Sequence, residues 1–247
     1  IPFMRRVMQV ATTITIIALA LVAGCDKQEG ETMSSGSDHA SGAGTAVSHP
    51  ADCSWVADTD LTPVANLATR AEAYVPTDLS PDISHLDATQ QQVLAKLVAA
   101  AKVMNDLFLV QATPCHAELA ARVAELDEAA VRYFQINYGP WDRRMHHEPF
   151  LGSLPHPEGA NYYPTDLTEA EKAQIERGEG KLSDLFTMVR RDGEGHLVAI
   201  PYSEFFADGL QKAARLLREA ADLTENASLR TFLKSRADAF LSDDYYQ

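Results

Sequence analysis

The residue types best suited to recognition chemistry are concentrated in one stretch, from Tyr133 to Asp166. Its aromatic side chains offer flat apolar faces with polar tips, and its asparagines and arginines add directional hydrogen bonds. Prolines and glycines fix an irregular backbone between them. The stretch is too long for a simple connection, so it is either a functional loop that binds a ligand or a loop that packs domains together. The residue types alone leave both interpretations open.

The same stretch contains His146-His147-Glu148, three residue types that bind metal ions. Adjacent residues point in different directions on a regular element, so they do not converge on one ion as the histidines of an HExxH helix do. Pro149 also excludes a helix that continues through them. We therefore expect an exposed polar loop and no metal site here. The sequence has no GxSxG, Walker A or GxGxxG motif, and no catalytic acid/base pair stands out.

Residues 1–24 have the pattern of a bacterial lipoprotein signal peptide. Arg5 and Arg6 precede an apolar run over residues 7–23, which is shorter than the ~20 residues that a membrane-spanning helix needs. The run ends in Ala23-Gly24-Cys25, which resembles a lipobox. We therefore expect Cys25 to carry the lipid and to become the N-terminus. The alternative is an ordinary secretory signal in which Cys25 has no role.

Residues 25–58 predict a flexible tether, because small and acidic residues dominate there without an apolar period. A folded domain is then expected at 59–247. The net charge of −14 argues against binding to nucleic acid, which needs clustered Lys and Arg. Such a charge also disfavours contact with an anionic bilayer, so the lipid would hold the protein at the membrane. We expect a protein anchored to the cell membrane that faces the periplasm.

Two further cysteines, Cys53 and Cys115, remain besides Cys25. In an oxidising compartment such a pair forms a disulfide. The alternative is two small, buried apolar side chains. Without a CxxC pair, the cysteines do not form a zinc-finger pattern.

Hydrophobic periodicity predicts a mainly α (α+β) fold, a helical lobe with one β-hairpin. We expect the helices at 87–110 and 113–134 to pack antiparallel. Thr165 or Thr168 would cap an exposed helix at 169–177. The other expected elements are a helix at 62–74, the hairpin within 185–201, and two helices that begin near 203 and 226.

Several segments in a fixed order resemble a known family. They are YFQINYGPWDR at 133–143, GANYYPTD at 159–166, FTMVRR at 186–191, VAIPYS at 198–203 and SDDYY at 242–246. Their order and spacing are similar to the N-terminal half of bacterial dipeptidyl peptidase III-like zinc hydrolases. The resemblance covers about residues 60–247.

This resemblance implies a two-lobed, largely helical metallopeptidase whose peptide substrate lies between the lobes. The zinc of that family comes from an HExxH or HExxxH-type helix and a later EExxA-D/E helix. Neither motif occurs in this sequence. The resemblance therefore implies a partial chain with a lipoprotein signal, a tether and the substrate-side lobe. Zinc would belong to the full-length enzyme, and we expect this chain to bind none and to have no catalytic residue.

The resemblance further implies that the lobe contacts the peptide through aromatic faces and polar side chains. The candidates are Asn137, Tyr138, Trp141, Asp142, Arg143, Asn161 and Tyr162. The alternative for each is packing or loop pinning; Asp142, for example, would pair with Arg143 or Arg144. A second interpretation of the whole chain is a complete, non-enzymatic lipoprotein, a helical scaffold or a module that binds a solute or a partner.

Overall fold

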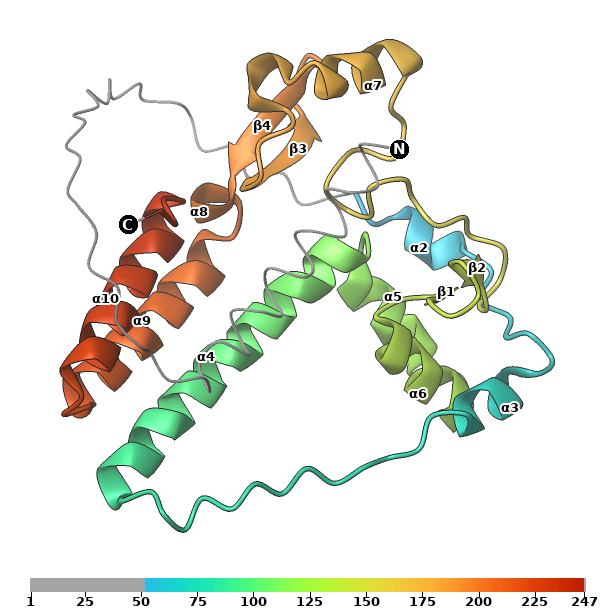
Figure 1. Ribbon diagram of the computed structural model, residues 1–247. Helices are drawn as coiled ribbons and strands as arrows, with labels where there is room; N and C mark the ends of the chain where they lie inside the picture. Colours follow the sequence, from blue (N-terminus) through green and yellow to red (C-terminus); the bar gives the residue numbers. More distant parts are fainter. Residues whose placement is uncertain (1–51, 247) are drawn as a thin grey trace. The chain divides into compact units, whose positions relative to one another are not determined.

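A computed structural model describes residues 52–246 as a mainly helical fold with two small antiparallel sheets (Figure 1). This confirms the predicted fold class. The predicted signal peptide, Cys25 and most of the predicted tether lie outside the described residues. Within the described part, no helix combines the length and the apolar character that crossing a bilayer requires.

The elements follow one another along residues 52–246. The helices are α2 (Trp55–Asp58), α3 (Leu67–Glu72), α4 (Ala88–Ala112), α5 (His116–Val123), α6 (Glu128–Asn137), α7 (Glu169–Glu176), the 3-10 turn η1 (Glu179–Lys181), α8 (Tyr202–Phe205), α9 (Ala207–Leu223) and α10 (Ala227–Ser242). Strand β1 (Trp141–Asp142) pairs with β2 (Glu148–Pro149), and β3 (Thr187–Arg191) pairs with β4 (Leu197–Pro201).

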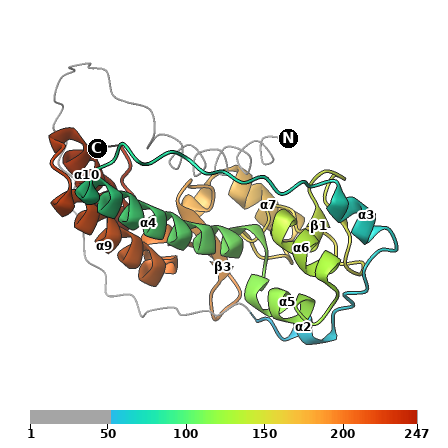
Figure 2. The same ribbon diagram turned by 90° about the horizontal axis from the view of Figure 1, so that it is seen from below.

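The first hydrophobic cluster joins α4, α9 and α10, which lie side by side in Figures 1 and 2. Helix α4 contributes Val93 and Val103, and α9 contributes buried alanines that allow a close approach. A Cβ at Gly209 would lie 2.6 Å from the Leu107 side chain, so glycine also lets these helices meet. The prediction that α4 packs antiparallel to the next helix was wrong. Its buried stripe contacts α9, because α9 presents the small residues that fit against it.

The second hydrophobic cluster gathers α2, α3, α5 and α6 around Phe150 and Leu151. The helix predicted at 113–134 is in fact two helices, α5 and α6. The Asp127 carboxylate accepts a hydrogen bond from Ala130 N at 2.8 Å and therefore starts a new helix as its N-cap. The apolar positions of the predicted helix, Leu119 and Phe134 among them, are nevertheless buried.

Residues 62–64 are extended, although the sequence predicts a helix over 62–74. Pro63 forms a β-bridge with Leu151, and Val64 N donates to Phe150 O at 3.1 Å. These tertiary bonds leave only Leu67–Glu72 as helix α3. The folded part also begins before the predicted boundary at 59, because Val56 of α2 is buried in the second cluster.

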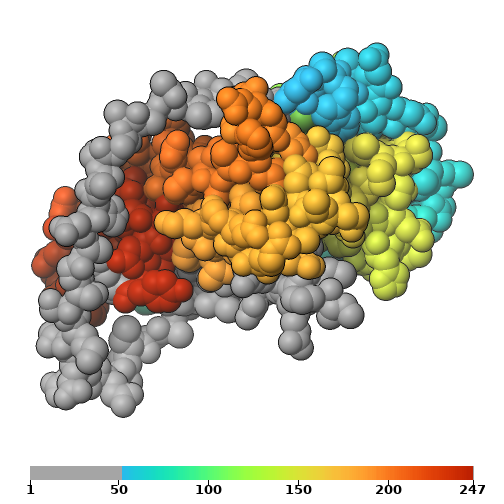
Figure 3. All heavy atoms as spheres, turned by 90° about the horizontal axis from the view of Figure 1, so that it is seen from above, coloured from blue at the N-terminus to red at the C-terminus, as the bar shows by residue number. Residues whose placement is uncertain are grey.

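Two local predictions in the C-terminal half are confirmed. Thr168, one of the two residues predicted to cap this helix, caps α7 in a reciprocal capping box with Glu171. The predicted hairpin is β3–β4, in which Thr187 lies opposite Pro201 and Arg191 opposite Leu197. Figure 3 shows the hairpin and the α7 region, in yellow to orange, between the C-terminal helices in red and the 52–75 segment in blue to cyan.

A disulfide joins Cys53 to Cys115 across a sequence separation of 62 residues. It ties the chain just before α2 to the residue that precedes α5. Cross-links that close long loops stabilise a fold chiefly by restricting the unfolded chain.

We expect Cys53→Ser to lower the free energy of unfolding by up to about 4 kcal/mol, the loop-closure value for a loop of this size. Urea denaturation followed by circular dichroism measures the change. Cys115→Ser removes the same bond and is the matched variant. Equal stability of wild type and both variants would show that the cross-link contributes nothing.

Candidate functional site

The C-terminal end of α4 is the point where the candidate residues meet. The last carbonyls of a helix lack partners within the helix. Asn161 donates hydrogen bonds to two of these carbonyls. Its side-chain Nδ2 donates to Val110 O at 2.7 Å, and its backbone N donates to Gln111 O at 3.0 Å. Asn161 is therefore a cap for α4, held in place by the loop 159–164.

The turn at Tyr138 and Gly139 reaches the same end of α4. Thr113 Oγ1 donates to Tyr138 O at 2.6 Å. Tyr138 has a φ of 59° and ends α6. A Cβ at Gly139 would lie 2.4 Å from Thr113 Oγ1, so only glycine permits this approach. The structure thus brings Tyr138 and Asn161, which are distant in sequence, to the same helix end.

Asp142 is the centre of a buried polar network. Its Oδ2 accepts hydrogen bonds from the Tyr133 hydroxyl at 2.8 Å and from Arg70 Nη1 at 3.1 Å. Its Oδ1 accepts from the backbone N of Arg144 and of Met145. Burial, followed by the hydrogen bond to Asp142, raises the pKa of Tyr133 to about 12. Asp142 pins the loop as the alternative interpretation expected, but its cationic partner is Arg70.

Asn137 and Trp141 also have partners within the chain. Asn137 Nδ2 donates to Tyr133 O, and its Oδ1 accepts from Arg143 N at 3.0 Å. Trp141 Nε1 donates to Leu154 O at 2.8 Å. Four of the seven candidate side chains are thus deeply buried, with exposed fractions of 8% or less: Asn137, Trp141, Asp142 and Asn161.

The other three candidates, Tyr138, Arg143 and Tyr162, are at least partly exposed. The Arg143 guanidinium lies over the Tyr138 ring, 5.4 Å from its centroid, and this pair forms a flat cationic surface. Tyr162 is half-buried, and burial raises its pKa to about 12. These residues can present apolar faces and hydrogen-bond donors to a ligand.

The three predicted loop residues His146, His147 and Glu148 are exposed. The His147 ring stacks on His156, with centroids 4.3 Å apart, and His156 meets the Trp141 ring at 4.9 Å. Burial lowers the pKa of His156 to about 4, so this histidine is neutral at ordinary pH. The histidines therefore pack the loop that follows β1.

Two residues at this site were not predicted from the sequence, Gln111 and Arg190. Gln111 is buried at the end of α4, and its Oε1 has no hydrogen-bond partner in the described part of the chain. Arg190 donates to Asn161 O at 3.1 Å and so holds the Asn161 loop on β3. The position of Gln111, a polar residue at the end of an apolar helix, was a sequence feature that could have indicated its role. Arg190 is followed directly by Arg191, and the sequence alone does not distinguish the roles of these two arginines.

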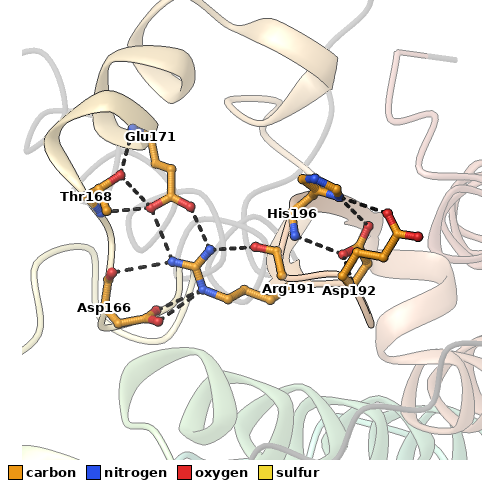
Figure 4. A network of polar contacts seen from close by, with 8 residues as sticks. Asp166, Thr168, Glu171, Arg191, Asp192 and His196 are labelled. Carbon is orange, nitrogen blue, oxygen red and sulfur yellow. Dashed lines mark hydrogen bonds and ion pairs between the residues drawn. The ribbon is translucent and has the colours of Figure 1, made fainter.

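Arg191, the other arginine of that run, has two acidic partners, Asp166 and Glu171 (Figure 4). Its Nε donates to Asp166, and its Nη1 donates to Glu171 Oε1 at 2.6 Å. The hydrogen bond from Arg191 lowers the pKa of Glu171 to about 2. This network joins the chain before α7, where Thr168 lies, to the hairpin.

Among the described residues, one group of three potential metal ligands lies close together: Cys53, Cys115 and Glu118. Both sulfurs are joined in the disulfide, so neither is the free thiolate that a zinc ion needs. The described residues therefore do not fit a catalytic zinc site.

The network around Asp142 predicts a large effect of its removal. Asp142→Ala leaves Tyr133 and Arg70 without their acceptor, so we expect the free energy of unfolding to fall by about 3 kcal/mol. The control is Asp166→Ala, because Asp166 is 69% exposed in its pair with Arg191. We expect that control to cost at most about 1 kcal/mol. Urea denaturation measures both, and similar losses would contradict the structural role of Asp142.

Two solved structures are similar to this chain in fold, and one further protein is similar to it in sequence. No family model matches the sequence. Nudix hydrolase 3 of Arabidopsis thaliana is 28% identical over 241 residues, which cover 74% of this chain and 31% of that protein. The solved structure of DPP III from Caldithrix abyssi is 39% identical with a TM-score of 0.67, over 72% of this chain and 36% of that one.

The solved dipeptidyl-peptidase III from Corallococcus sp. strain EGB is 37% identical with a TM-score of 0.67, over 75% of this chain and 36% of that one. The chain thus spans about a third of the length of the proteins that it matches. The resemblance stated from the sequence is confirmed for the fold: the described residues have a fold similar to the corresponding part of dipeptidyl peptidase III.

Proposed function

We propose that this chain is the peptide-binding lobe of a membrane-anchored, zinc-dependent hydrolase similar to dipeptidyl peptidase III, and that it is not active alone. The observation that supports the proposal is the fold similarity at 39% and 37% identity to two solved dipeptidyl peptidase III structures. All three proteins matched by sequence or structure are named as hydrolases or peptidases.

The candidate residues have two roles in this proposal. Tyr138, Arg143 and Tyr162 contact the peptide, because their side chains are at least partly exposed. The buried candidates hold the loops in place, as Asp142 and Asn161 do through the bonds described above. An aromatic face beside a guanidinium suits a peptide backbone, which offers both apolar groups and carbonyl acceptors.

In this proposal, zinc is bound by another stretch of polypeptide, which carries the zinc-binding motifs. Those motifs are absent from the sequence, and the described residues do not supply a substitute. The contribution of this chain is to bind and orient the peptide, which lowers the entropic cost of the reaction.

A peptide-binding measurement tests the proposal. We expect the purified chain to bind the tetrapeptide Ala-Phe-Ala-Ala in isothermal titration calorimetry, and Arg143→Ala to weaken binding about tenfold because a charged donor is lost. Arg144→Ala is the matched control, since Arg144 is also exposed and lies over a tyrosine ring, that of Tyr74, at 5.6 Å. If no peptide binds, the alternative of a non-enzymatic lipoprotein scaffold is favoured.

Membrane attachment is a separate part of the proposal and depends on Cys25, which lies outside the described residues. We expect the chain to fractionate with bacterial membranes, and Cys25→Ser to release it into the periplasmic fraction, because the lipid acceptor is removed. Ser34→Ala, in the predicted tether, is the control. Retention of Cys25→Ser in the membrane fraction would contradict lipid anchoring.

A further inference from the structure

Arg190 and Arg191 are neighbours on β3 with opposite electrostatic surroundings. Successive side chains of a strand point to opposite faces. Arg191 pairs with two acids, Asp166 and Glu171. Arg190 forms no ion pair with any acid in the described part of the chain, although the whole sequence contains 35 acidic residues.

The Arg190 guanidinium is held by neutral groups. Its Nη1 donates to Val189 O at 2.7 Å and weakly to Tyr162 O at 3.5 Å, and its Nη2 donates to Asn161 O at 3.1 Å. One face lies over the Phe205 ring, 4.8 Å from its centroid. Within residues 52–246, Nε has no hydrogen-bond acceptor. Nε and one N–H of Nη2 are therefore the donors of the guanidinium that these contacts leave without an acceptor.

This position is unfavourable for a charge without a counter-ion. Burial lowers the pKa of Arg190 to about 10, since a guanidinium that loses water without gaining an anion is destabilised. Carbonyl oxygens and an aromatic ring compensate for part of that loss. Arg190 is half-buried, so part of the residue remains in contact with solvent. An anion that binds here regains electrostatic energy which the described part of the fold does not supply.

The geometry of the edge formed by Nε and Nη2 selects a carboxylate. Two parallel N–H groups of a guanidinium match the two oxygens of a carboxylate in a bidentate pair. The site offers one uncompensated positive charge, since Arg191 is already paired. That charge suits a single carboxylate better than a doubly charged phosphate in a chain with a net charge of −14.

We propose that Arg190 is a carboxylate anchor for the bound peptide, in which its Nε edge receives a carboxylate of the ligand. This inference depends on the proposed peptide-binding function and adds a substrate class to it: peptides with a carboxylate within reach of this edge. Asn161 and Tyr162, two of the predicted binding residues, are joined to Arg190 through their carbonyls. The proposed anchor, Arg190, is thus bonded directly to the loop that carries Tyr162.

The test compares three peptides on the full chain by isothermal titration calorimetry. They are Ala-Phe-Ala-Ala, its C-terminal amide, and the amide of Ala-Phe-Glu-Ala, whose only carboxylate is on a side chain. We expect at least one carboxylate-bearing peptide to bind about tenfold more tightly than the neutral amide. The tighter of the two identifies the source of the carboxylate as the C-terminus or a side chain.

Variants then assign the effect to Arg190. Arg190→Gln should abolish the preference for the carboxylate while the neutral amide still binds, and Arg190→Lys should keep only part of it because lysine has no bidentate edge. Arg191→Gln is the matched control and should keep the preference. The comparison of peptides on the wild type needs no variant, so it holds even if Arg190→Gln fails to fold.

Three outcomes would overturn the proposal. Equal binding of all three peptides to the wild type rejects the anchor but leaves the peptide-binding function intact. A preference that persists in both Arg190→Gln and Arg190→Lys places the carboxylate elsewhere. No binding of any peptide rejects the proposed function together with this inference.

Discussion

The arrangement of this domain depends on how the C-terminal end of α4 is satisfied. Asn161 donates to the carbonyls of Val110 and Gln111, and Thr113 donates to Tyr138 O. Helix α4 belongs to the first hydrophobic cluster, whereas α6, which Tyr138 ends, belongs to the second. These hydrogen bonds therefore join two apolar clusters at one polar point, where unpaired carbonyls would be costly.

The residues that make the loop recognisable in the sequence mostly organise its backbone. Asp142 collects hydrogen bonds from a tyrosine, an arginine and two backbone N–H groups, and Trp141 donates to Leu154 O. A loop built in this way is rigid, because each buried polar group is fixed by a partner. Rigid loops can hold the exposed Arg143 and the half-buried Tyr162 in fixed positions, which in the proposed function reduces the ordering that binding requires.

Neighbouring residues of the same type can have different roles on one strand. Arg191 lies among acids and stabilises the position of α7 relative to the hairpin. Arg190, one residue earlier, lies on neutral carbonyls and a phenylalanine ring. The difference arises from the two faces of the strand, since one meets the acidic chain before α7 and the other meets the Asn161 loop and α8. This difference in surroundings could not be predicted from two consecutive arginines in the sequence.

The sequence by itself determined several local elements of the structure. Apolar spacing predicted α4, α9 and α10, Thr165 or Thr168 was expected to cap α7, and the Gly-rich turn predicted the β3–β4 hairpin. These features depend on residues within a few positions of one another. Only the tertiary structure decided that α4 packs on α9, that residues 62–64 are extended against Phe150, and that Asp142 and Asn161 are buried. Those outcomes depend on contacts between segments far apart in the chain, where the burial of apolar surface and the pairing of polar groups outweigh local preference.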